Sequence, residues 1–175
     1  FPAQNEDVQL PLTTITRLKH LVLPRYSGDA SIKQLGDAQQ LVFLSAGENV
    51  SDEAVLSILG KLDSLTGLAL PRAHISNEAI EEFLAIQPKL TFLDLSGRND
   101  APEHCRLTES TIESLEGIKT LLLKFRTIDD RCIESLSKSK SLTRIYVDSE
   151  YVPDLAARAP WYNPANPNQW PFDED

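Results

Sequence analysis

Three adjacent residues, Glu103, His104 and Cys105, carry side chains that are often used for metal binding or nucleophilic chemistry. A thiolate beside an imidazole and a carboxylate could hold a metal ion or attack a carbonyl carbon. Side chains at consecutive positions point in different directions, however, and the distance to Cys132 matches no zinc-binding spacing. We therefore expect their segment, SGRNDAPEHCR at 96–106, to be a structural or interaction loop, and a disulfide between the two cysteines stays open.

The other two histidines, His20 and His74, lie far from His104 in the sequence. Neither has a Ser, Cys or Asp at a spacing typical of a catalytic motif, and the sequence contains no phosphate-binding loop, nucleophile elbow or zinc-protease motif. The sequence thus predicts a protein that is not an enzyme and that uses no cofactor or metal.

The elements that would carry any site follow a repeated pattern. Six hexads fit Leu-x-x-Leu-x-Leu with conservative replacements: LKHLVL at 18–23, LVFLSA at 41–46, LTGLAL at 65–70, LTFLDL at 90–95, IKTLLL at 118–123 and LTRIYV at 142–147. The hexads start 23 to 28 residues apart. Each reads as a short strand whose first, fourth and sixth residues point into a core, while the third and fifth point outward.

A second phrase follows four of the hexads and predicts a helix start. It reads VSDEAV at 50–55, ISNEAI at 75–80, LTESTI at 107–112 and IDDRCI at 128–133. Its second residue is of the type that caps a helix N-terminus, and the acids after it suit the positive end of the helix dipole. Apolar residues then recur at helical spacing, so each helix offers one apolar stripe to its strand. A single unit cannot bury this stripe, and neighbouring units must therefore stack.

These hexads, their period and the helix phrase resemble leucine-rich repeats over residues 18–147, most closely the bacterial 24-residue repeats and those of ribonuclease-inhibitor and F-box type. The resemblance implies an α/β fold, a right-handed horseshoe with a parallel sheet on the concave face and helices on the convex face. It also implies recognition of another molecule rather than chemistry. The Asn or Cys that usually follows the strand of such a repeat is missing here, so we expect the turn to be held differently.

The outward hexad positions predict a binding surface, because apolar and aromatic residues occur there where water is expected. We expect a protein or peptide to bind on this concave face. The proposed contact residues are Phe43, Arg72, Phe92, Leu122, Lys124, Arg144 and Tyr146. An alternative is that the outward side chains make only shallow contacts with one another or with the C-terminal tail.

Charge narrows the class of partner. The chain carries 26 acidic residues against 17 Lys and Arg, a net charge of −9, and has no basic cluster. We therefore predict no nucleic-acid partner. The outward strand positions and the turns after them are nevertheless locally basic, which favours an acidic partner with apolar anchors. No apolar run reaches the ~20 residues of a membrane helix, so no membrane insertion is expected.

Three parts divide the chain: an N-terminal cap at 1–17, a solenoid of about six repeats at 18–152, and a strap rich in Pro, Asn and aromatic residues at 153–175. The strap is predicted either to cover the exposed edge of the last repeat or to dock on another protein. The second case would make the chain an adaptor subunit of a larger complex. The sequence starts at Phe1 and contains no Met, which is compatible with an exported or organellar mature chain, and the compartment stays open.

Overall fold

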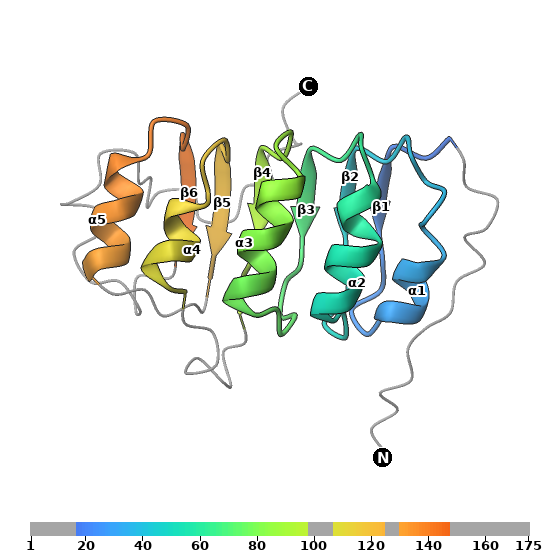
Figure 1. Cartoon of the computed structure of the whole chain (residues 1–175). Helices are drawn as coiled ribbons and strands as arrows, with labels where there is room; N and C mark the ends of the chain where they lie inside the picture. Colours follow the sequence, from blue (N-terminus) through green and yellow to red (C-terminus); the bar gives the residue numbers. More distant parts are fainter. Residues whose placement is uncertain (1–16, 98–106, 125–129, 148–175) are drawn as a thin grey trace, which may run out of the picture.

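The computed structural model of this chain describes residues 17–97, 107–124 and 130–147. Six strands alternate with helices along this part of the chain (Figure 1). The strands are β1 His20–Val22, β2 Phe43–Ser45, β3 Gly67–Ala69, β4 Phe92–Asp94, β5 Thr120–Leu123 and β6 Arg144–Val147. The helices are α1 Asp29–Lys33, α2 Asp52–Ser57, α3 Asn77–Ile86, α4 Glu109–Glu113 and α5 Asp130–Lys138, with a 3-10 turn, η1, at Leu59–Lys61.

The strands form one parallel sheet in the order β1-β2-β3-β4-β5-β6. Equivalent hexad positions lie opposite one another throughout, so that Leu21, Leu44 and Leu68 are neighbours across the first three strands. Leu93, Leu121 and Ile145 continue this row across the last three. The register read from the repeated hexads is therefore confirmed for all six strands.

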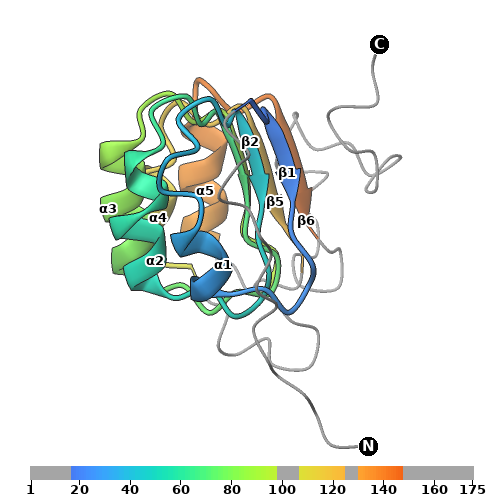
Figure 2. The same cartoon turned by 90° about the vertical axis from the view of Figure 1, so that its right-hand side faces the viewer.

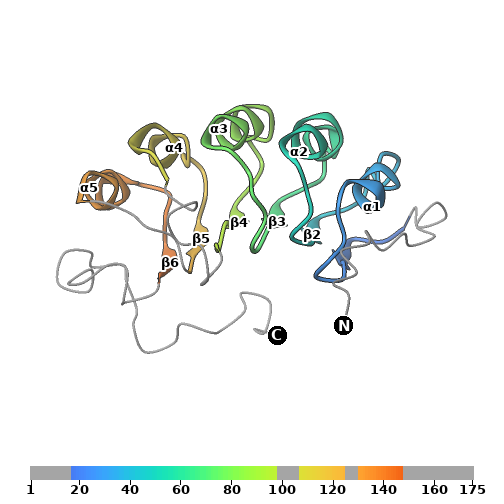
Figure 3. The same ribbon diagram turned by 90° about the horizontal axis from the view of Figure 1, so that it is seen from below.

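All the helices of the described ranges lie on one side of the sheet, and the fold is α/β with a solenoid-like arrangement. Seen along the strands, the units form an arc with the helices on its outer side and the strands on its inner side (Figure 3). The edge-on view in Figure 2 shows the same two layers, helices on one side and strands on the other. The inner side of the arc is thus the side on which a binding surface was predicted.

The core lies between these two layers and consists chiefly of hexad leucines. Leu41, Leu44 and Ala46 of the second hexad are 0 to 3% exposed, and Leu90, Leu93 and Leu95 of the fourth are 1 to 2% exposed. Helix residues such as Val55 and Phe83 close the core from the other side. The prediction that the first, fourth and sixth positions point inward is confirmed, because these side chains leave water for a shared interior.

The helix phrases begin helices as predicted. The hydroxyl oxygens of Ser51, Ser76 and Thr108 accept hydrogen bonds from the backbone N–H three residues later, at 3.3, 3.1 and 3.2 Å. Each bond satisfies an amide that the first helical turn leaves without an intrahelical acceptor. The short phrase thus sets where α2, α3 and α4 start.

The residue after the cap of α1, α2 and α3 links one repeat to the next, a role that was not predicted. Asp29 accepts hydrogen bonds from the backbone N–H of Ser51 at 2.8 Å and from its hydroxyl at 2.6 Å. Asp52 accepts from the backbone N–H of Ser76 at 3.0 Å, and Asn77 accepts from that of Thr108 at 3.4 Å. The carboxylate or amide at the first helical position therefore holds the cap of the following helix, and a ladder of side chains connects the helix N-termini.

No helix phrase marks the start of α1, because Gly28 stands where the other repeats have a capping side chain. A Cβ at this position would lie 2.5 Å from the carbonyl oxygen of Asn49, the residue with which Gly28 forms an isolated parallel bridge. The close approach of the second repeat excludes any side chain here, so the cap signal is missing from the sequence although the helix forms.

Within the described ranges, no helix has the length and apolar character needed to cross a bilayer. Most of the N-terminal cap, the Glu103-His104-Cys105 segment and the strap at 153–175 lie outside the described residues.

Candidate functional site

The side of the sheet that faces away from the helices, here called the strand face, presents two rows of side chains. The first row consists of His20, Phe43, Gly67, Phe92, Thr120 and Arg144, and the second of Val22, Ser45, Ala69, Asp94, Leu122 and Tyr146. Both rows follow from the alternation of side chains along a strand and the unbroken register across the sheet.

An apolar cluster separate from the main core occupies the centre of the strand face. It consists of Phe43, Ala69 and Phe92, with the half-buried Leu122 packed against it, and is here called the aromatic cluster. The rings of Phe43 and Phe92 meet edge to face, with centroids 5.7 Å apart and planes inclined by 60°. This geometry brings the positive edge of one ring to the negative face of the other, which is the preferred arrangement of an aromatic pair.

Gly67 makes the aromatic pair possible. It lies between Phe43 and Phe92 in the first row, and a Cβ there would be only 2.7 Å from Cδ2 of Phe43. Two aromatic residues separated by two strand spacings, roughly 10 Å, can touch only if the strand between them leaves the space above it open. The phenylalanine rings therefore lean over the glycine instead of standing out from the sheet.

The expectation that Phe43 and Phe92 stand out as open anchors is not met, since each is only 5% exposed. Their contact across Gly67 removes most of their surface from water. Ala69 and Asp94 between them are also buried, at 0% and 4%. The surface that remains open lies at the two ends of the strand face, where His20, Val22 and Arg144 are exposed.

Basic side chains gather at the β5–β6 end of the strand face. Arg144 and Lys119 are exposed, and Lys124 is half-buried at the turn that follows β5. Leu122 and Tyr146, both half-buried, are register partners on these two strands. The structure thus brings Leu122, Lys124, Arg144 and Tyr146 together at one end of the aromatic cluster, as a mixed apolar and basic surface.

Arg72 is separate from this basic end. It lies after β3 with a φ of 69°, a left-handed conformation that is unfavourable for a residue with a Cβ. Its Nε donates to Oε2 of Glu48 at 3.2 Å, and Nε of Arg25 donates to the same oxygen at 3.2 Å. Its backbone N–H also donates to the carbonyl of Ser96 at 2.6 Å. These bonds give Arg72 a role in joining three successive turns.

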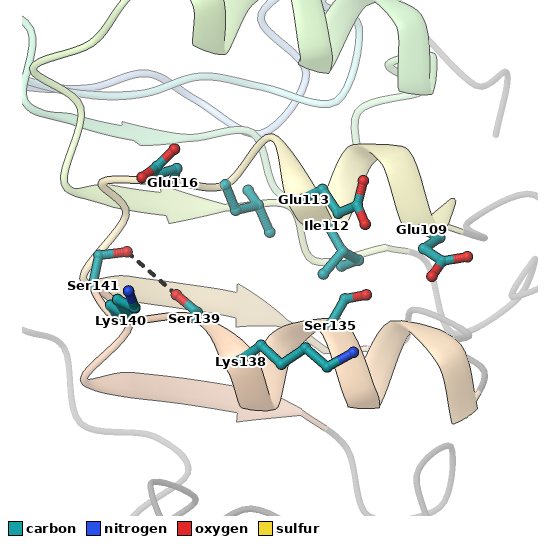
Figure 4. A pocket seen from close by; sticks show the side chains of 10 residues that line it. Glu109, Ile112, Glu113, Glu116, Ser135, Lys138, Ser139, Lys140 and Ser141 are labelled. Carbon is teal, nitrogen blue, oxygen red and sulfur yellow. Dashed lines mark hydrogen bonds between the residues drawn. The ribbon is translucent and has the colours of Figure 1, made fainter.

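On the opposite side of the molecule, a groove of about 380 Å³ lies between α4 and α5. Figure 4 shows Glu109, Glu113 and Lys138 along its rim and Ile112 at its base. Lys138 forms an ion pair of 2.8 Å with Glu134, and this hydrogen bond raises the pKa of Lys138 and lowers the pKa of Glu134. The negative charges of Glu109 and Glu113 add to the effect on Lys138. Both partners of the ion pair are exposed, and the groove is a solvated gap between a short helix and a longer one.

The described residues contain no group of three or more His, Cys, Asp or Glu side chains that could hold a metal ion. Cys132 is buried at 1% exposure, as expected for a thiol on the inner face of a helix, and its Sγ lies 3.5 Å from the carbonyl oxygen of Leu107. His20 is exposed at the edge of the strand face, with its ring centroid 6.5 Å from that of Phe43. His74 is exposed at the surface of the third unit.

One residue of the strand face, Gly67, was missed as a member of the site. The signal was present in the sequence, since the third hexad position reads Phe43, Gly67 and Phe92 in three consecutive repeats. A small residue between two aromatic ones in the same column indicates that the rings meet above it. Hexad alignment by itself shows the column, whereas the inclination of the rings depends on their rotamers.

The sequence was also compared with known proteins. Models of known protein families gave no match to the chain, and curated proteins gave none either.

Proposed function

We propose that this chain is a non-catalytic recognition module of the leucine-rich-repeat type, a right-handed horseshoe that binds a protein or peptide on its strand face. Six parallel strands in unbroken register, with hexad leucines in the core, support the repeat assignment. The spacing of 23 to 28 residues between hexads supports it further.

The aromatic cluster is the observation that carries the proposal. Purely parallel sheets are normally covered by other elements on both faces. Here all the described helices lie on one side, and the other side has an apolar centre that is distinct from the core. The cluster is nearly closed by its own side chains, and the half-buried Leu122 and Tyr146 beside it supply the apolar surface that supports binding of a further segment.

The charges around the cluster define the partner. Lys119 and Arg144 are exposed at the β5–β6 end, and Lys124 lies beside them after β5. The chain as a whole carries a net charge of −9, so this end differs in sign from the body. A peptide with aromatic or branched apolar anchors and acidic residues beside them is complementary to both features.

The test is selection from a displayed library of random peptides, followed by calorimetric titration of the enriched sequences. We expect enriched peptides to combine acidic and aromatic residues. Lys119→Glu with Arg144→Glu should weaken their binding about a hundredfold. Each charge reversal replaces an attraction by a repulsion and lowers the binding free energy by about 1.4 kcal/mol, which is a factor of about ten in affinity.

The matched control carries the same two charge changes on other surfaces, Lys33→Glu with Lys61→Glu. Both lysines are exposed, one on α1 and one on η1. Binding by the control should stay within about threefold of the wild type, since these sites are screened from the strand face by salt. Equal loss of binding in both double variants, or enrichment of peptides without acids, would contradict the proposed surface.

A further inference from the structure

We propose that the C-terminal segment of this chain, residues 153–175, is an intramolecular ligand of its own strand face and competes there with an external partner. This inference rests on the proposed function of the strand face as a peptide-binding surface. It names the first occupant of that surface.

Burial at the centre of the strand face is the first argument. Ala69 is 0% exposed, Asp94 4% and Thr120 8%, although every described helix lies on the other side of the sheet. Val22, in the same row as Ala69 but at the edge, is 71% exposed. The middle side chains already pack on one another, so the centre of the strand face is a preformed apolar platform on which a further segment can dock, while the edge of the sheet is open.

The chemistry of the segment matches that surface. Residues 153–175 contain four of the twelve aromatic residues of the chain, Trp161, Tyr162, Trp170 and Phe172. They contain four acidic residues and one arginine, and the sequence ends in Asp-Glu-Asp. Aromatic anchors suit the aromatic cluster, and the acids suit the basic β5–β6 end. This is the combination of apolar anchors and acidic flanks that the strand face selects.

The position of the segment in the chain places it within reach. The last described strand, β6, ends at Val147, beside the basic residues, and Trp161 follows 14 residues later. Fourteen extended residues span up to ~46 Å. The distance from β6 to β2 is four strand spacings, or ~19 Å, so the segment can reach every residue of the aromatic cluster.

Five prolines in the segment lower the cost of docking. Proline restricts φ, so a chain rich in it is already extended and loses less conformational entropy when it binds. Tethering also gives the segment an effective concentration of about a millimolar at the strand face. An external partner must therefore bind more tightly than the tethered segment does, and this sets a threshold for recognition.

Tryptophan fluorescence of the full chain tests the proposal. Trp161 and Trp170 are the only tryptophans of the chain, so emission reports on the segment alone. We expect emission at shorter wavelength than that of N-acetyltryptophanamide and weak quenching by acrylamide. Lys119→Glu with Arg144→Glu should shift the emission wavelength and the acrylamide quenching toward the values of N-acetyltryptophanamide. Lys33→Glu with Lys61→Glu should change neither. Far-UV circular dichroism of each variant checks that the repeats remain folded.

A second variant, Leu122→Asp, tests the apolar side of the contact independently of the basic end. It should release the tryptophans as well, because Leu122 is half-buried and packs on the aromatic cluster. If acrylamide quenches the tryptophans of the wild type as strongly as N-acetyltryptophanamide, the proposal is overturned. Shielded tryptophans that respond to neither variant would also overturn it, since the segment would then dock elsewhere. Shielding that disappears on dilution would assign the contact to a second copy of the chain.

The two proposals can fail separately. If the tryptophans of the wild type are exposed while acidic peptides still bind in a manner that depends on Lys119 and Arg144, the intramolecular ligand is refuted and the proposed function stands. If the tryptophans are shielded but no peptide binds, even to a variant with Trp161→Ala and Trp170→Ala, recognition of an external partner is refuted.

Discussion

The ladder of side chains between helix N-termini predicts an unequal response to the loss of similar acids. Asp29, Asp52 and Glu53 all lie in the first turn of a helix, where a negative charge interacts favourably with the helix dipole. Only the two aspartates accept hydrogen bonds from Ser51 and Ser76 in the next repeat. Replacing each acid by alanine therefore separates the bond between repeats from the effect of charge.

The magnitude follows from the number of bonds. A hydrogen bond to a charged group contributes about 1.5–3 kcal/mol when buried, and these partly buried bonds should contribute about half of that. Asp29 accepts two bonds, so we expect Asp29→Ala to lower the free energy of unfolding by about 2 kcal/mol, Asp52→Ala by about 1 kcal/mol, and Glu53→Ala by about 0.5 kcal/mol. For a chain of this length 2 kcal/mol corresponds to a decrease in Tm of about 4–8 °C.

Urea unfolding followed by far-UV circular dichroism measures these differences. An unchanged slope of the unfolding free energy against urea concentration would show that each variant exposes the same amount of surface on unfolding. Asp52→Asn is the conservative control. Asn77 fills the same position in the third unit and accepts the equivalent bond, so Asn at 52 should retain most of the stability. The reasoning would be refuted if Asp52→Asn were as damaging as Asp52→Ala, or if Asp29→Ala and Glu53→Ala had equal effects.

Two further predictions concern other parts of the chain. Gly67→Ala should destabilise the protein by about 1–3 kcal/mol and change its near-UV circular dichroism, because the added Cβ displaces the ring of Phe43. Gly36→Ala, where the nearest atom would be at 3.7 Å, should be neutral by the same measurements. Glu134→Gln should lower the urea midpoint at pH 7 by removing the ion pair with Lys138. Since this bond lowers the pKa of Glu134, its stabilisation is present above the usual glutamate value of 4.5 and is lost as the pH falls through the lowered pKa. The urea midpoints of wild type and variant should therefore converge in acid, and a difference that persists at pH 2 would contradict this assignment.

Much of the fold was predictable because each repeat carries two local signals. Hexad spacing placed all six strands and their register, and the cap residues placed the starts of three described helices. The start of α1 had no such signal because its cap is Gly28, a residue required by the close contact with the next repeat and not by helix capping. Local signals therefore predict an element only where local chemistry forms it.

The candidate site was less predictable than the fold. Aligning the six hexads with one another placed Leu122, Arg144 and Tyr146 on neighbouring strands, and the register confirms this. It did not predict that Phe43 and Phe92 would bury each other over Gly67, since this depends on ring rotamers. Nor did it predict that Arg72 would be held by Glu48, since that contact depends on how two turns curve.

The amino-acid sequence by itself determined the parallel arrangement, the register and the inward direction of the hexad leucines, because burying one stripe per repeat leaves stacking as the only solution. The tertiary structure alone decided which outward side chains remain open to water. That choice depends on contacts between side chains in separate repeats, such as the two phenylalanine rings above one glycine, and a linear pattern contains no information about their angles. Other contacts between repeats join the capping residue of one helix to the acid at the start of the previous helix. The repeats are therefore held together by bonds that no single repeat encodes.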